Sequence, residues 1–370
     1  MDGRALRDGI TRVLETEAFY ARMAPSESER QRLLDIIEKI PLPEPVAFQL
    51  TLARETRPRL FDNALRAAWT MAWLAREGME NQFDIGMAAA AGLLHDLGML
   101  HLNPVLMDHR AELTRELRRE LYSHPIVSHV LIERHHAYPK VMLDGVLQHH
   151  EYRNGSGYPR NLKGSQISTT GQRLAITDLL VAMISAHDDG GEMRLGVLLR
   201  MNMHRYAKDL IDSVLALLQP GQDPRSEAIA TAGDPAALLA QAHDILQACP
   251  RDASRFAGIT AARREAWATL REQVDELGRT LAEAGLTPSQ LEQLGSAALE
   301  DAMVHRELTL LTREAAWQLH ALARQARRRW GAGRDGIFPQ EILEWTGRVE
   351  QFSQAVRSGQ QGQGLPGHFH

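Results

Sequence analysis

The chain has 370 residues, of which 24% are charged and 44% are hydrophobic, and its formal net charge at pH 7 is -5. This length is sufficient for two domains that each bury a core, and the weakly acidic balance gives no general attraction to nucleic acids or anionic membranes, so neither is expected as a partner. The single cysteine, Cys249, excludes an internal disulfide and a metal cluster built from thiolates.

Residues 1–54 are predicted to carry N-terminal helices and a proline-rich connection at Ile40–Pro45. Charged side chains interrupt the start of the chain, so no secretory signal is expected. The longest apolar run, Ile85–Leu94, is shorter than the roughly 20 residues that a membrane-spanning helix needs. We therefore expect a cytoplasmic protein.

Helical periodicity dominates the chain. After Pro58, which suits a first helical turn, apolar residues recur at three- and four-residue steps. Val274, Leu277 and Leu281 repeat the pattern, and Thr287–Gln290 is typical of a capped helix start. Because alternation with a period of two is nearly absent, we predict an all-α protein.

Composition suggests a division of the rest of the chain. Residues 55–219 contain the histidines with a proposed chemical role, and 220–235 is a linker candidate rich in proline, glycine and small residues. Residues 236–359 form a C-terminal helical region whose long amphipathic helices offer a surface for a protein partner or a homodimer. Residues 360–370 are rich in glycine and glutamine and are expected to be disordered.

A histidine and an aspartate end the apolar run Ile85–Leu94. Because this helix should be buried, an unpaired Asp96 would cost several kcal/mol, and a metal ion is one natural partner. A structural alternative is an ion pair with an arginine such as Arg66. Besides His95, the candidates His124, the pair His149 and His150, and Asp178 follow, end or interrupt other predicted helices, as in metal sites at the core of helix bundles.

The adjacent histidines His149 and His150 set a geometric condition. Neighbouring side chains on a helix point about 100° apart, so the two imidazoles cannot bind one ion side by side. Either they serve two ions, or the helix unwinds and one of them turns. This arrangement favours a site with more than one metal.

Several motifs together resemble the HD-GYP domain, a subgroup of the HD metal-dependent phosphohydrolases. The resemblance covers roughly residues 58 to 218 and is carried by His95-Asp96-Leu97-Gly98, His124-Pro125, His149-His150-Glu151, Asn154–Pro159 and Asp178. It implies an HD-type helical domain that binds two or three metals, usually iron or manganese. It also implies hydrolysis of cyclic di-GMP by a metal-activated hydroxide.

The resemblance also implies a role for each matching residue. His95, Asp96 and Asp178 would bind a first metal, and Asp96 would bridge to a second metal held by His124, His149 and His150. Asp96 and Glu151 are the catalytic assignments, with Glu151 expected to orient the ligands rather than to bind metal. The expected substrate-binding residues are Arg66, Gly155, Gly157, Tyr158 and Pro159.

Four positions depart from the family pattern. Asn63 stands where the family has its first ligand histidine, so we expect the first metal site to be weak or empty, with one metal bound at the second. Met99 and Val181 replace a lysine and an aspartate, and His187–Gly190 replaces a basic segment. Two interpretations therefore compete: a working cyclic di-GMP phosphodiesterase, or a catalytically degenerate domain that binds cyclic di-GMP or a protein partner in signalling.

Overall fold

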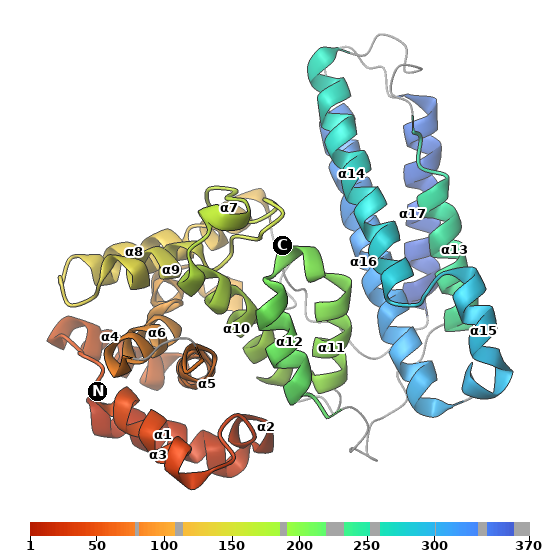
Figure 1. The fold of residues 1–370 in the computed structure, drawn as a ribbon. Helices are drawn as coiled ribbons and strands as arrows, with labels where there is room; N and C mark the ends of the chain where they lie inside the picture. The colour runs from red at the N-terminus through yellow and green to blue at the C-terminus, as the bar shows by residue number, and fades with distance from the viewer. Residues whose placement is uncertain are drawn as a thin grey trace. The chain divides into compact units, whose positions relative to one another are not determined.

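A computed structural model describes residues 1–77, 81–107, 114–185, 191–219, 233–251, 260–299, 301–331 and 339–358. Several expectations lie outside these residues, namely the segment His187–Gly190, most of the 220–235 linker and the tail 360–370. The chain divides into two compact units, residues 1–195 with 203–219, and residues 196–202 with the C-terminal region (Figure 1). The N-terminal segment 1–54 lies in the same compact unit as the predicted HD-type domain.

The prediction of an all-α protein is confirmed for the part of the chain that is described. In the first unit the helices are α1 (Gly3–Thr16), α2 (Ala18–Ala21), α3 (Glu27–Glu38), α4 (Glu44–Thr56), α5 (Pro58–Ala75), α6 (Gln82–Leu94), α7 (Arg115–Leu121), α8 (His124–Glu133), α9 (Lys140–Gln148), α10 (Thr169–Ser185) and α12 (Lys208–Leu217). Short 3₁₀ helices are η1 (Leu97–His101), η2 (Pro104–Met107), η3 (Gly164–Gln166) and η4 (Met203–Arg205). The division between the units falls within α11 (Gly191–Met201).

Helix α6 is the buried centre of the first unit. Every residue from Ile85 to Leu94 is buried, as the apolar run predicts. The contact with α5 is closest at Gly92, where an added Cβ would lie 2.5 Å from the carbonyl oxygen of Ala67. By length and composition Gln82–His101 could span a membrane, but 78% of its most apolar window is buried inside the protein, as expected of a core helix.

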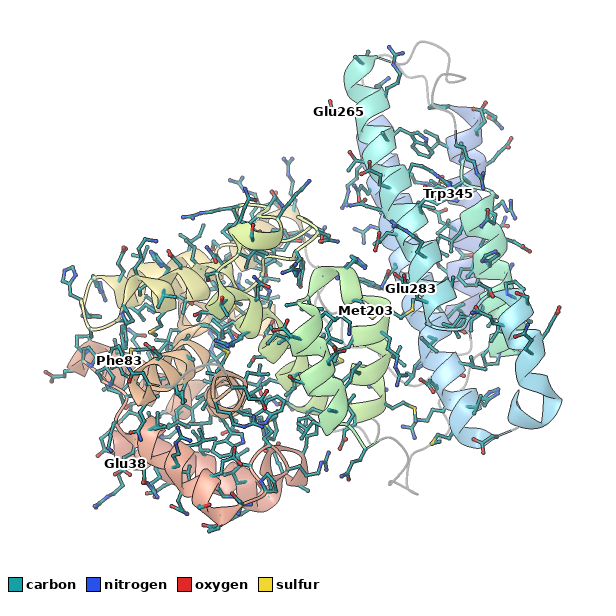
Figure 2. All side chains as sticks on the ribbon, viewed as in Figure 1. Glu38, Phe83, Met203, Glu265, Glu283 and Trp345 are labelled. Carbon is teal, nitrogen blue, oxygen red and sulfur yellow. The ribbon has the colours of Figure 1, made fainter. Side chains whose placement is uncertain are left out.

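The C-terminal unit is a bundle of α13 (Pro235–Gln247), α14 (Ala261–Glu283), α15 (Pro288–Leu299), α16 (Ala302–Gly331) and α17 (Gln340–Ser358). The predicted stripe of Val274, Leu277 and Leu281 is buried in it. Trp345, labelled in Figure 2, is 2% exposed and donates its indole N–H to the Ile245 carbonyl over 3.0 Å. Helix α15 begins at Pro288, as the Thr287 cap predicts.

The close approach of α5 and α6 predicts a large effect of a single methyl group. Gly92→Ala should lower the free energy of unfolding by about 1–3 kcal/mol, because the new Cβ forces two packed backbones apart. Denaturant unfolding followed by circular dichroism measures this change. Gly278→Ala on α14, where an added Cβ meets no atom within 4 Å, is the matched control and should not destabilise the protein. Equal stability of both variants would contradict the packing of α5 against α6.

Candidate metal centre

A close contact at Gly98 places the pair of His95 and Asp96 beside α8. His95 ends α6 and Asp96 begins the turn into η1. The Gly98 amide donates to Ser128 Oγ over 2.8 Å, and a Cβ on Gly98 would lie 2.4 Å from the carbonyl oxygen of His124. The turn therefore lies directly against α8. As a result Asp96 Oδ1 is 3.3 Å from His124 Nε2.

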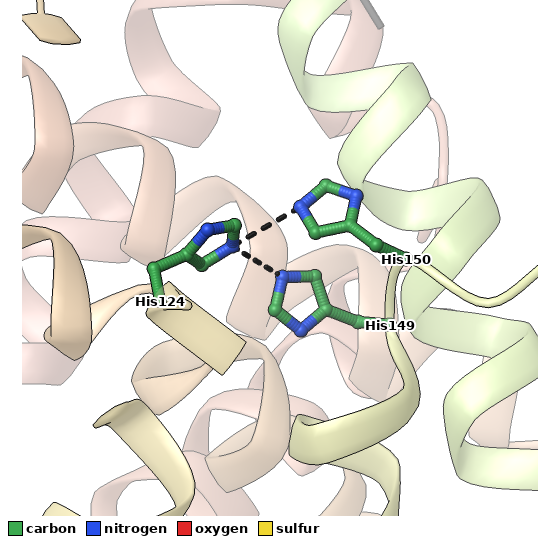
Figure 3. A group of neighbouring side chains, drawn as sticks. All are labelled: His124, His149 and His150. Atoms are coloured by element: carbon green, nitrogen blue, oxygen red, sulfur yellow. Dashed lines mark hydrogen bonds between the residues drawn. The ribbon is translucent and has the colours of Figure 1, made fainter. Parts of the chain in front are cut away.

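Two histidines at the end of α9 face the histidine that begins α8. Nε2 of His124 lies 3.0 Å from Nε2 of His149 and 3.1 Å from Nε2 of His150 (Figure 3). Helix α9 ends at Gln148, so the backbone turns between the two neighbouring histidines. Both rings thus approach the same nitrogen of His124, and the choice between one ion and two stays a prediction.

Backbone carbonyls determine which nitrogen of three imidazoles faces this point. Nδ1 of His95, His124 and His149 lies 2.7–2.8 Å from the carbonyl oxygen three residues earlier in the chain. A carbonyl oxygen only accepts, so each Nδ1 carries a proton and Nε2 is the nitrogen that faces the cluster.

Burial keeps the rings of His124, His149 and His150 neutral, and two neutral imidazoles repel one another where their unprotonated nitrogens meet. Burial lowers the pKa of His124, and it lowers the pKa values of His149 and His150 well below the ordinary value. The short contact between Nε2 of His124 and Nε2 of His149 therefore brings two lone pairs together. A cation between them would turn this repulsion into coordination, so the residues present fit a bound metal.

Two carboxylates complete the cluster. Asp96 Oδ2 lies 3.4 Å from His95 Nε2, and Asp178 on α10 lies 3.9 Å from His95 and 3.8 Å from His150. Burial, followed by the neighbouring charge of Asp96, raises the pKa of Asp178 to about 7. A cation would favour the ionised form of both carboxylates.

The structure thus brings together all the residues predicted as ligands, which we call the six-residue cluster: His95, Asp96, His124, His149, His150 and Asp178. Within it, two sets of three ligand atoms lie within 4.8 Å of one another, one of His124, His149 and His150 and one of His95, Asp96 and His149. The first set is the one predicted for the second metal. In the other set His149 stands where Asp178 was expected, while Asp178 lies beside both His95 and His150.

The glycine-rich loop 155–159 lies against the ligand histidines. A Cβ on Gly157 would lie 2.3 Å from the carbonyl oxygen of His150, so only glycine fits here. The Tyr158 amide donates to that same oxygen over 3.0 Å, and the Tyr158 ring stacks on the His150 ring. Burial raises the pKa of Tyr158 well above its ordinary value, so its hydroxyl keeps its proton.

Glu151 is buried and holds the chain that follows the loop. The residue is 1% exposed, and its carboxylate accepts from the backbone amides of Arg160 over 2.6 Å and Leu162 over 2.8 Å. Both oxygens are thus used to hold the chain that follows the loop. The expectation that Glu151 orients the ligands rather than binding metal stays a prediction, and the contacts observed are these two amides.

Arg66 is engaged by Glu17 and Asn63. The Arg66 guanidinium forms an ion pair with Glu17 at 2.7 Å and donates to Asn63 Oδ1 over 3.0 Å. The alternative in which Arg66 pairs with Asp96 is therefore wrong. The substrate-binding role of Arg66 stays a prediction; to contact a phosphate, the guanidinium would have to exchange Glu17 for it. The amide oxygen of Asn63 is likewise engaged by Arg66.

Two of the departures from the family pattern are apolar side chains, and two further residues had no signal in the sequence. Met99 and Val181 are buried apolar residues, 8% and 4% exposed. Ser128, which receives the Gly98 amide, and Tyr122, whose ring stacks on Tyr158, were not predicted. A lone serine on a helix and a tyrosine two residues before a histidine match no motif, so only the three-dimensional arrangement reveals them.

Comparison with known proteins places the cluster in context. Residues 38–215 match the model of the family described as HD domain, which begins earlier than the predicted boundary at residue 55. The chain is 28% identical over 122 residues to a 3'3'-cGAMP-specific phosphodiesterase 1 of Vibrio cholerae, across 33% of this chain and 28% of that protein. It is 32% identical over 123 residues to a cyclic di-GMP phosphodiesterase of Thermotoga maritima, across 32% of this chain and 33% of that protein. The chain thus spans a third or less of these relatives, and no solved structure matches it.

Removal of one facing imidazole should release bound metal. We expect His149→Ala to bind at least tenfold less Mn²⁺ than the wild type, because His149 belongs to both ligand sets. Metal content after dialysis, measured by plasma emission spectrometry, checks this. His101→Ala is the control, since His101 is exposed and contacts Gln49 instead. Equal metal contents in His149→Ala and the wild type would contradict the assignment.

Proposed function

We propose, on the premise that residues 38–215 form an HD domain of the HD-GYP type, that this domain is a metal-dependent phosphodiesterase of cyclic dinucleotides. The observation that supports it best is the meeting of inward-facing, neutral imidazole nitrogens with two carboxylates at one buried point. Imidazole and carboxylate ligands suit iron or manganese. We also propose that the protein is cytoplasmic, as expected from the sequence.

Each part of the centre has a task in such a reaction. The six-residue cluster would hold the metals, with His124, His149 and His150 around one ion and His95, Asp96 and Asp178 around the other. When bound, the metals would lower the pKa of a water molecule and neutralise charge on the phosphoryl oxygens. The hydroxyl of Tyr158, whose ring lies on His150, keeps its proton, and Glu151 anchors the chain that follows the loop.

The substrate class is also part of the proposal. The two relatives are named for cyclic di-GMP and for 3'3'-cGAMP, which share the cyclic diphosphodiester ring. We infer that this chain acts on a cyclic dinucleotide, with cyclic di-GMP as the first candidate. A protein partner or homodimer through the C-terminal helices remains a separate expectation.

A second candidate function rests on the residues around Arg66. Because the Arg66 charge is neutralised by Glu17 and Met99 carries no charge, the described part of the site offers less positive charge to a substrate phosphate than the family pattern. A domain of this kind could bind a cyclic dinucleotide or a protein partner and signal without turnover. The two functions differ in one observable, the appearance of linear product.

Turnover of a defined substrate separates the two functions. The full chain, loaded with Mn²⁺ or Fe²⁺ under anaerobic conditions, should convert cyclic di-GMP to linear dinucleotide, detected by reversed-phase chromatography. Asp96→Asn should lower kcat by at least about 100-fold, because Asp96 contacts both His95 and His124. Bound metal without linear product from cyclic di-GMP or 3'3'-cGAMP would overturn the phosphodiesterase proposal and favour the signalling one.

Restoring the family histidine at position 63 tests the cause of any weak activity. We expect Asn63→His to raise the bound metal per chain and to increase kcat several-fold, because imidazole is a stronger ligand than an amide. Metal analysis and the same turnover assay measure this. Asp62→His is the matched control, since this exposed neighbour points about 100° away around α5. The same gain in both variants, or none in Asn63→His, would contradict a missing ligand at position 63.

A further inference from the structure

We propose that Tyr122 is a positioning residue of the metal centre, which holds the His150 imidazole in place through the Tyr158 ring. The proposal rests on the proposed function only in that the six-residue cluster binds metal. Tyr122 follows the end of α7 and lies two residues before the ligand His124. The same short segment of chain therefore places a ligand and, by this inference, the support for another ligand.

Three rings form a continuous stack beside the centre. The ring centroids of Tyr122 and Tyr158 are 4.3 Å apart with an interplanar angle of 18°, and those of Tyr158 and His150 are 4.7 Å apart with an angle of 21°. The Tyr158 ring is thus held between two nearly parallel rings, one on each face. Both faces of the Tyr158 ring are therefore used by the stack.

His150 needs such a support because it is oriented differently from the other ligand histidines. His95, His124 and His149 are each fixed by a bond from Nδ1 to a backbone carbonyl. Among the described residues no such bond is found for His150, whose Nδ1 lies 3.8 Å from Asp178 Oδ2. The other ligand histidines contact His150 at Nε2 and at the ring edge, and Tyr158 stacks on its face.

Tyr122 is the contact on the face of the Tyr158 ring that points away from His150. The Tyr158 backbone is tied to the His150 carbonyl, and Gly157 lies in direct contact with the same backbone. The chain after the loop is held by Glu151. These contacts fix the main chain, so the side of the Tyr158 ring away from His150 is limited by Tyr122.

Metal affinity of the full chain tests this role without requiring turnover. After removal of metal, we would titrate Mn²⁺ by isothermal calorimetry into the wild type, Tyr122→Leu, Tyr122→Phe and the control Tyr138→Leu. We expect Tyr122→Leu to weaken Mn²⁺ binding about two- to tenfold, the range for one aromatic stacking contact. Tyr122→Phe keeps the ring and should match the wild type. Tyr138 is buried but contacts Pro41 outside the cluster, so its loss should leave the Mn²⁺ affinity unchanged.

The outcomes separate this inference from the proposed function. Wild-type affinity in Tyr122→Leu, or equal weakening in Tyr122→Phe and Tyr122→Leu, would overturn the positioning role. Metal binding that depends on the ring at position 122, without any linear product, would support the inference and refute the phosphodiesterase. A wild type that binds no Mn²⁺ would overturn both. Circular dichroism confirms folding of each variant, and Tyr122→Met replaces Tyr122→Leu if the latter is unfolded.

Discussion

The metal centre depends on a repulsion between two imidazole nitrogens that the fold holds close together. Hydrogen bonds to backbone carbonyls keep the protons of His124 and His149 on Nδ1, and burial keeps both rings neutral. Their Nε2 lone pairs nevertheless face one another at 3.0 Å. Such an arrangement is costly in an empty, dehydrated site and favourable around a cation. The glycine contacts at Gly98 and Gly157 bring the surrounding chain close enough for this to occur.

Much of the fold could be predicted from the sequence because its signals are local. The apolar run of α6 indicated a helix buried on all sides, and Pro58 and Thr287 marked the starts of α5 and α15. The extent of the first compact unit could not be predicted in this way. Residues 1–54 join it through packing against helices far along the chain, and packing partners leave no periodic mark in either segment.

The convergence of the ligands was predictable for a different reason, namely that residues of unusual chemistry end several apolar helices. Ion pairs and hydrogen bonds for which several partners compete could not be predicted from the sequence. Arg66 is paired with Glu17 across the fold, and Glu151 is engaged by the amides of Arg160 and Leu162. A motif indicates that a charged residue is present, but the partner that neutralises it is set by the fold. Tyr122 illustrates the same limit, because its proposed role depends on stacking against Tyr158, and the sequence does not indicate that contact.

The bonds from imidazole to carbonyl have a structural consequence. Gly92, Leu121 and Val146 lie in the last turns of three helices, where carbonyl oxygens lack partners within the helix, and in each case a nearby histidine supplies the missing donor. These histidines therefore terminate helices as well as face the centre. A substitution at any of the three would therefore remove the donor to a helix-end carbonyl as well as a ligand of the centre. In this fold the chain uses one side chain both to finish a helix and to build the centre.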